Sequence, residues 1–302
     1  MYKYWSDIQQ PQMWQLIMEA GTERLAAMAF SPSDRQPMRF HEWEFPAASA
    51  CEGIQALENT IYDHPGLLTD FGKVTLLYDT LRMVPIPDTD NEADAGEIFR
   101  SIYPPCLRQG KILLSRIPEM GMALCFEIPA DTENFLRRTF PCITIDHPVA
   151  PLCRYFRAKH PLRRRGKTLV NIRGKRLDII TLGEHTPLAV SSHFIADPMD
   201  AVYYILASRQ GLELRDSDEI MIAGDRTLRA AVTPILRRYV RYVMPALFPS
   251  VMYRAGKESL AAPFELVVSP LINTARSSSH SLTQPPVTTI KDTYASHENN
   301  QR

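Results

Sequence analysis

Short apolar runs, bounded by glycine, proline or charged residues, recur through the second half of the chain. The segments KTLVNIRG, RLDIITLG and TPLAVSSHF are rich in β-branched residues and predict a three-stranded antiparallel meander. A helix should follow, because Asp197 can cap it, Pro198 suits its first turn and Asp200 adds a carboxylate near the positive end of the dipole. The strand EIMIAG, a helix with apolar residues spaced from Leu228 to Val243, a weaker strand FPSVMYR and the apolar segment PFELVVSPLI complete the order β-β-β-α-β-α-β-α. Pro234 should kink or divide that helix.

The first half repeats this pattern less regularly. The strands ERLAAMAF and MRFHEWEF precede a helix over residues 48–62 and the strand KVTLLYD. An insertion with a short helix over 93–101 comes next, and then the strands KILLSRI and MALCFEIP, a helix over 132–138, the strand CITID and a helix over 148–158. The sequence therefore predicts two related α/β domains in tandem, flanking a cleft that suits a ligand.

The ends of the chain differ in composition from the middle. Residues 1–20 predict a loosely attached leader with one short helix over 13–19. The first domain is predicted over residues 21–150, with its insertion near 85–110, and the second over 160–272. Residues 275–302 are rich in Ser, Thr, His, Asn and Pro. Such a segment buries too little apolar surface to offset its ordering entropy, so we expect a disordered tail.

The overall composition excludes several classes of protein. The chain of 302 residues is 45% hydrophobic, and its 34 basic and 34 acidic residues give a formal net charge of zero. Nothing global attracts it to nucleic acid or to an anionic membrane. Its five cysteines form no CxxC pair, which is typical of reduced thiols in a cytosol. No apolar run approaches the roughly 20 residues of a membrane helix. We therefore expect a cytoplasmic protein without membrane insertion.

Three stretches carry a resemblance to a known family. The segment DAVYYILASRQGLELRDSDEIMIAGD follows the meander, and VTLLYDTLRMVPIP and FPCITIDHPVAPL lie upstream. Together they resemble an uncharacterised Bacteroidetes family, a domain of unknown function in the actin-like ATPase superfamily, over roughly residues 21–272. The resemblance implies an actin-like (ribonuclease H-like) α/β fold. In active members ATP sits in the interdomain cleft, held by backbone N–H groups of two hairpins and by aspartates linked to Mg²⁺.

The resemblance places the first phosphate hairpin after the strand ERLAAMAF. Active members have Asp, Gly and a hydroxyl there, whereas this sequence reads AFSPSDR. No Asp ends the strand, no Gly opens the loop, and Pro32 removes a backbone donor. Ser31 and Ser33 remain as candidates to bind an anion. An ordinary turn is the alternative interpretation.

The second hairpin and the adenosine motif are also altered. Asn171 stands where the superfamily prefers Asp, and Arg173 where it prefers Gly, with Gly174 one place later. Arg173 would crowd a backbone cradle, although its guanidinium could itself pair with phosphate. Alternatively, Gly174 only supplies the positive φ of a two-residue turn. The strand IMIAGD keeps Gly224 of the adenosine motif and has Asp225 next, which would equally serve as a helix cap.

The remaining catalytic candidates are few. Asp146 and His147 end the strand CITIDHP, where active members position the attacking water. His147 suits a general base by its ordinary pKa, and a capping or interface role is the alternative. Ser191 and His193 share a face of a predicted strand, but the sequence supplies no third member of a triad. No spacing of His, Cys and carboxylates predicts a metal site.

Two arginine clusters offer a basic surface. One spans residues 163–167, and the other comprises Arg226, Arg229, Arg237, Arg238 and Arg241. They could bind RNA or an acidic partner. No aromatic interleaving or nucleic-acid motif accompanies them, so a solvated amphipathic face is the alternative.

These observations predict a degenerate actin-like protein that works as a binding or scaffold module for a protein partner, without ATP hydrolysis and without a cofactor. One alternative is an ATP-binding protein or ATPase, with Asn171, Arg173 and Gly224 near ATP, His147 near the γ-phosphate, and Mg²⁺ as a cofactor. The other is an RNA-associated protein that uses the arginine clusters, whose binding would weaken steeply as salt rises.

Overall fold

A computed structural model gives the fold of the chain. It describes residue 5 and residues 8–34, 38–45, 50–88, 92–104, 110–160, 166–183 and 187–279.

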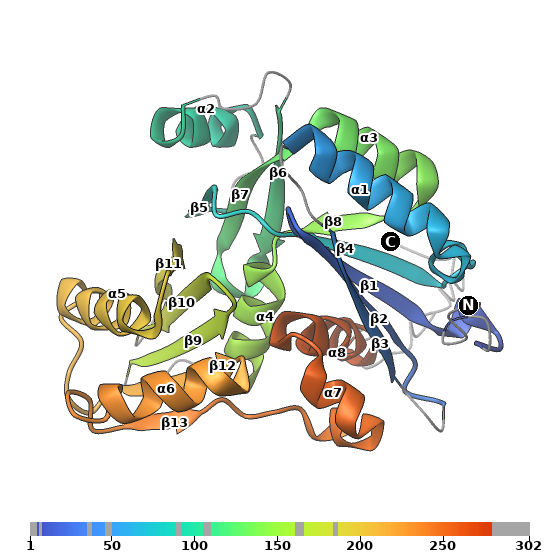
Figure 1. Cartoon of the computed structure of the whole chain (residues 1–302). Helices are drawn as coiled ribbons and strands as arrows, with labels where there is room; N and C mark the ends of the chain where they lie inside the picture. The colour runs from blue at the N-terminus through green and yellow to red at the C-terminus, as the bar shows by residue number, and fades with distance from the viewer. Residues whose placement is uncertain are drawn as a thin grey trace, which may run out of the picture.

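The first half forms a five-stranded sheet in the order β3-β2-β1-β4-β8 (Figure 1). Its strands are β1 (Gln15–Ala20), β2 (Arg24–Phe30), β3 (Met38–Glu44), β4 (Lys73–Tyr78) and β8 (Thr144–Asp146). The strands β1, β2 and β3 form an antiparallel meander, and β4 pairs parallel with β1 and with β8. In β1, Leu16 and Met18 join one core cluster while Ile17 joins another. The sheet is therefore covered on both faces.

The second half repeats this sheet with the same pairing of strands, in the order β11-β10-β9-β12-β13. Its strands are β9 (Lys167–Arg173), β10 (Arg176–Leu182), β11 (Pro187–Phe194), β12 (Glu219–Gly224) and β13 (Val243–Pro245). The strands β9, β10 and β11 form the antiparallel meander, and β12 pairs parallel with β9 and with β13. Strand for strand, β1 thus corresponds to β9, β2 to β10, β3 to β11, β4 to β12 and β8 to β13.

A third, three-stranded sheet is inserted after β4, in the order β5-β7-β6. Its strands are β5 (Met83–Pro87), β6 (Gly110–Ile117) and β7 (Met122–Pro129), all antiparallel. The helix α2 (Glu92–Ile102) covers one face through Ala95 and Phe99, which pack with Val84 and Cys125. The insertion thus has a small apolar core.

Helices cover both faces of each large sheet, as the figure shows. They are α1 (Ala50–Asp63), α3 (Ala130–Thr139), α4 (Val149–Lys159), α5 (Pro198–Gly211), α6 (Arg226–Leu236), α7 (Lys257–Ala261) and α8 (Phe264–Ser279). Four short 3-10 helices are η1 (Pro11–Met13), η2 (Pro65–Leu68), η3 (Pro118–Met120) and η4 (Ser250–Ala255). In α8, Leu266 packs on the first sheet, whereas Phe264 and Val268 join the core cluster that includes second-sheet strands. The helix α8 therefore links the two halves.

Most predicted elements form, and local signals explain why. The two-domain α/β fold is confirmed, as is the capping box at α5, where the Asp197 carboxylate accepts hydrogen bonds from the N–H groups of Met199 and Asp200. The positions of the domain boundaries stay a prediction. Among the described residues, no helix has both the length and the apolar character needed to span a membrane.

Four predictions about the secondary-structure elements are wrong. The leader and its helix fail because residues 15–20 form β1 in the middle of the first sheet. The helix expected from Leu228 to Val243 with a kink or break at Pro234 instead ends at Leu236, two residues after that proline, and Val243 pairs with Ile220 in β13. The predicted strand FPSVMYR is mainly η4, in which Met252 packs on the first sheet. The disordered tail predicted from residue 275 is wrong over residues 275–279, which belong to α8; residues 280–302 lie outside the described part.

Candidate functional site

Two equivalent hairpins face each other across the two halves. In the second half, Arg173 pairs with Arg176 at the end of the β9–β10 ladder. In the first half, the β1–β2 ladder ends at Ala20 and Leu25, and the Gly21 N–H donates to the Arg24 carbonyl one step further. The register thus matches Gly21 with Arg173, Arg24 with Arg176 and Glu19 with Asn171.

This symmetry corrects the position of the first hairpin. The turn with Ser31 and Ser33 joins β2 to β3, at the opposite end of β2, so it is not the counterpart of the β9–β10 turn. The counterpart reads Glu19-Ala20-Gly21-Thr22: an acid at the end of the strand, then a glycine and a hydroxyl. This string follows the apolar run LIM, which is the signal that could have revealed it. The prediction of a leader over residues 1–20 excluded this run from the first domain.

The Arg173 side chain occupies the space between the two hairpins. Alternation along β9 directs Asn171 and Arg173 to the face opposite Val170 and Ile172, toward α8. The Arg173 guanidinium donates to Glu265 Oε1 on α8 at 2.6 Å, to Glu19 Oε1 on β1, and to Glu42 Oε1 on β3 at 3.4 Å. These ion pairs tie β9 to both the first sheet and the C-terminal helix.

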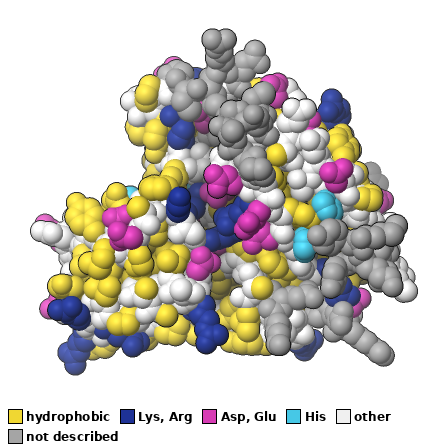
Figure 2. All heavy atoms as spheres, in the orientation of Figure 1, with side chains coloured by type: hydrophobic (Ala, Val, Ile, Leu, Met, Phe, Trp, Pro, Cys, Tyr) yellow, Lys and Arg dark blue, Asp and Glu magenta, His cyan; other side chains and the backbone are white. Residues whose placement is uncertain are grey.

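Arg176 fills the adjacent position. Its guanidinium donates to Asp79 Oδ1 after β4, to the Thr80 carbonyl oxygen at 3.0 Å, to Asp178 Oδ1 at 2.8 Å and to Ser192 Oγ at 3.1 Å. Because Asp79 and Thr80 belong to the first half, Arg176 is a second bridge between the halves. Figure 2 shows basic and acidic side chains gathered in the middle of this face, between the two halves.

Carboxylates outnumber guanidinium groups in this network. Three arginines, Arg24, Arg173 and Arg176, meet five acids: Glu19, Glu42, Asp79, Asp178 and Glu265. Burial raises the pKa of Glu19 to about 8, and repulsion from Glu265 and Asp79 adds to this effect. Burial also raises the pKa of Asp178. Glu19 therefore takes up a proton far more readily than an exposed glutamate does.

Two buried oxygen atoms in the network have no hydrogen-bond partner. They are Glu19 Oε2 and Asn171 Oδ1, at equivalent positions of the two hairpins. The amide of Asn171 is held in place by its Nδ2 group, which donates to Glu265 Oε2 at 3.2 Å. Among the described residues, no group of three or more His, Cys, Asp and Glu side chains could hold a metal ion.

The glycines of the two predicted motifs have different roles. Gly174 has φ of +51°, and an added Cβ would meet no atom, so it supplies the turn conformation. Gly224 has φ of +96°, and an added Cβ would lie 1.9 Å from the Ile172 carbonyl oxygen. Asp225 does not cap α6 with its side chain, contrary to one expectation. Its carboxylate accepts a hydrogen bond from the Gly174 N–H at 2.8 Å, which links the turn after β12 to the β9–β10 hairpin.

His147 and Asp146 lie beside the network but are already engaged. His147 is fully buried, and its Nε2 lies 2.9 Å from the Thr80 carbonyl oxygen while its Nδ1 accepts from the Val149 N–H at 3.3 Å. Burial and the nearby Arg176 lower the pKa of His147 to about 3, so the ring is neutral. Asp146 pairs with Arg154 at 2.5 Å.

The other candidates lie apart from the hairpins. His193 Nε2 lies 3.0 Å from Ser191 Oγ, and the His193 ring stacks on Tyr204. The first arginine cluster is only partly described, since residues 163–165 are outside the described ranges. In the second cluster, Arg237 donates to the Val243 carbonyl oxygen, and Arg241 lies over the Tyr242 ring.

Two sheets with identical strand order, joined by helices and facing each other through their first hairpins, define an actin-like fold. A Bacteroides thetaiotaomicron VPI-5482 protein with an actin-like ATPase fold and unknown function superposes with a TM-score of 0.70, at 18% identity over 82% of this chain and 94% of that chain. A chain of the PilM–PilN type IV pilus biogenesis complex superposes with a TM-score of 0.54, at 14% identity over 88% of this chain and 99% of that chain.

The sequence comparison assigns the family. Residues 6–243 match the model of the family described as protein of unknown function (DUF3822), and the chain therefore belongs to this family. No curated protein matches the chain.

Proposed function

We propose that this protein is a binding or scaffold module that holds its actin-like halves together with ion pairs and does not hydrolyse ATP. The observation that carries the proposal is the position of the Arg173 guanidinium, which is 6% exposed and lies between Glu19 and Glu265. A glycine is expected there in active members of the superfamily, because a cradle of backbone N–H groups must come close to the phosphates.

The side chains between the hairpins do not fit a nucleoside triphosphate. The three arginines are already paired with carboxylates, which are in excess, so a triphosphate would add negative charge to a buried, acid-rich region. Asn171 also replaces a carboxylate expected to position Mg²⁺ through water. His147 adds no accessible base, because both ring nitrogens have partners.

A scaffold role agrees with the buried ion pairs between the two halves. Buried ion pairs are strongly directional and fix one arrangement of the elements they join, here β1, β3, β9 and α8. A fixed arrangement presents a constant outer surface to a partner. The PilM–PilN similarity supplies a precedent at the level of fold, since that chain belongs to a protein–protein complex.

ATP binding is the second candidate function, and the β1–β2 hairpin favours it. The string Glu19-Ala20-Gly21-Thr22 keeps the order of acid, glycine and hydroxyl expected of an active first hairpin, with Glu in place of Asp. The unpaired oxygens of Glu19 and Asn171 are the groups that would face a hydrated cation. This function requires Arg173 to leave Glu19 and Glu265, which breaks the ion pairs that join β9 to β1 and α8.

Calorimetric titration of the full chain with ATP, with and without Mg²⁺, distinguishes the two candidates. We expect no heat of binding up to millimolar ATP under conditions in which an actin-fold ATPase responds. Magnesium-dependent binding that is lost in Asn171→Ala and in Thr22→Trp would establish the second candidate. Thr22 is exposed at the hairpin tip, so the tryptophan blocks the hairpin without entering the core.

A further inference from the structure

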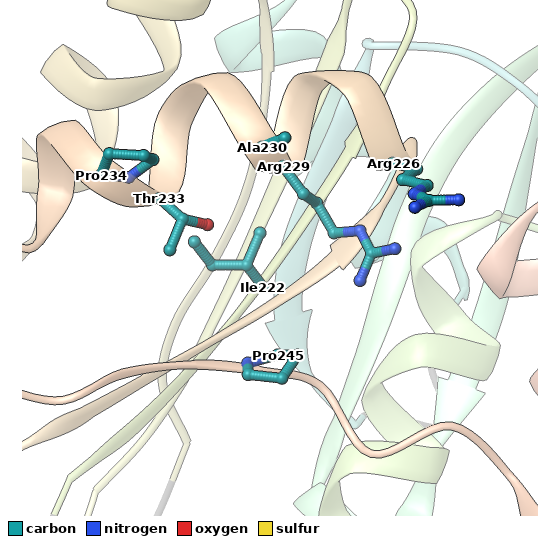
Figure 3. A pocket seen from close by; sticks show the side chains of 7 residues that line it. All are labelled: Ile222, Arg226, Arg229, Ala230, Thr233, Pro234 and Pro245. Atoms are coloured by element: carbon teal, nitrogen blue, oxygen red, sulfur yellow. The ribbon is translucent and has the colours of Figure 1, made fainter.

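A pocket of about 360 Å³ lies between α6 and the edge of the second sheet (Figure 3). Arg226, Arg229 and Thr233 line it from one side of α6, at a spacing of about one helical turn, and Arg229 and Thr233 point toward Ile222 and Pro245. The opposite wall is Ile222 on β12 and Pro245 on β13. The pocket is thus basic at one end and apolar along its floor, and every residue that lines it comes from the second half.

The two arginines of the pocket have no acidic partner within the described part of the chain. Arg229 Nε is inaccessible to solvent and has no hydrogen-bond partner. A buried donor without an acceptor is unfavourable, and an anionic oxygen that enters the pocket would supply the missing acceptor. The nearest carboxylate in the sequence, Asp225, accepts from the Gly174 N–H instead.

The charge of the residues around the pocket also favours an anionic ligand. The segment from Arg226 to Gly256 contains six arginines and no Asp or Glu. A surface of one sign attracts and orients ligands of the opposite sign. The sequence and the pocket therefore both select a carboxylate or another anion.

The pocket suits a side chain of a protein better than a free metabolite. Arg226, Ala230, Pro234 and Pro245 are exposed, so the pocket would cover a ligand on one side only, whereas metabolite sites bury most of the ligand surface. The edge of β13 does not accept an added strand. The Val243 carbonyl oxygen is taken by Arg237, and Pro245 has no N–H group. Recognition must therefore rely on side chains.

We propose that this pocket docks an acidic segment of a protein partner. A carboxylate of that segment pairs with Arg226 and Arg229, and a neighbouring apolar side chain lies over Ile222 and Pro245. The inference extends the proposed scaffold function by naming the chemistry of the partner. RNA is the competing occupant of a basic surface and is an outcome of the test.

The test begins with selection from a random dodecapeptide display library on the purified full chain. Enriched peptides are synthesised, labelled and titrated by fluorescence anisotropy against wild type and the double variant Arg226→Gln, Arg229→Gln. The matched control is Arg238→Gln, Arg241→Gln, which removes the same charge outside the pocket. Thermal melting checks that both variants remain folded. A single-stranded RNA oligonucleotide is titrated in parallel.

We expect the enriched peptides to carry Asp or Glu beside an apolar residue. Affinity should fall about tenfold or more in the pocket variant, as expected for losing one charged hydrogen bond or more, and less than about twofold in the control. Enrichment without acidic residues, or equal losses in both variants, overturns the proposal. Tighter binding of RNA, weakened equally by both variants, assigns the surface to nucleic acid. The peptide titrations contain no nucleotide. A negative result in them therefore does not change the outcome of the ATP titration that tests the proposed function.

Discussion

The guanidinium of Arg173 on β9 donates a hydrogen bond to the carboxyl group of Glu19 on β1, although the two residues are 154 positions apart in the chain. Glu19 is the counterpart of Asn171, two residues before the position that Arg173 holds in the second hairpin, so the contact joins the two repeated halves. The same guanidinium pairs with Glu265 on α8. One side chain therefore ties three segments of the fold together.

Replacing Arg173 should destabilise the protein strongly. In Arg173→Met, the buried carboxyl groups of Glu19 and Glu265 lose their shared partner, and breaking a buried ion pair from one side costs about 3–5 kcal/mol. Urea unfolding followed by circular dichroism measures the change. Arg238→Met, at an exposed position, is the control and should change the free energy of unfolding by less than about 0.5 kcal/mol. Similar values for both variants would show that the network does not hold the halves together.

The stability of the protein should depend on the proton of Glu19. Burial, with repulsion from Glu265 and Asp79, raises the pKa of this carboxyl from 4.5 to about 8, so the folded state holds the proton more tightly than the unfolded state. The stabilisation is complete below pH 4.5 and is lost as the pH rises through about 8. Glu19→Gln mimics the protonated form and should remove this loss.

The measurement is the difference in unfolding free energy between wild type and Glu19→Gln across that pH range. As the pH rises, the free energy of unfolding of the wild type should fall relative to that of Glu19→Gln. Glu42→Gln, in which a partly exposed carboxylate of the same network is neutralised, is the matched control. A constant difference between wild type and Glu19→Gln would mean that Glu19 is ionised throughout.

The two turn glycines should respond differently to alanine. In Gly224→Ala the new Cβ would lie 1.9 Å from the Ile172 carbonyl oxygen, so the backbone must move, and we expect a loss of at least about 3 kcal/mol. In Gly174→Ala the Cβ meets open space, and only the left-handed conformation is penalised, by about 1–2 kcal/mol. Thermal melts of both variants test which substitution destabilises the protein more. A larger loss for Gly174→Ala would contradict the close approach of β12 to β9.

The C-terminal helix should prove part of the core. Leu266 on α8 is fully buried against the first sheet, so Leu266→Ala should cost about 2–5 kcal/mol. Leu260→Ala on α7, where the side chain is 70% exposed, should cost little. Chemical denaturation of the two variants measures both values. An equally small effect of Leu266→Ala would mean that α8 is only loosely attached.

Local signals were sufficient where the residues that decide a structure are close in sequence. The capping box of α5 depends on Asp197 and Asp200, and the β9–β10 turn on Gly174, so both could be predicted. The strand β1 was missed because Gln15–Ala20 lies in a central position that its neighbours β2 and β4 create. The first hairpin and Glu19 depend on β1, so they could not be predicted without it.

The sequence by itself determined the α/β class, the repeated order of elements and the altered residues of the second hairpin, because these follow from apolar periodicity, glycine and proline over short distances. Only the tertiary structure decided what the altered residues do. Packing of the two sheets against α8 brings Arg173 to Glu19 and Glu265, and folds α6 over β13 to form the arginine pocket. Contacts between residues so far apart depend on how the whole chain packs, which no local pattern encodes.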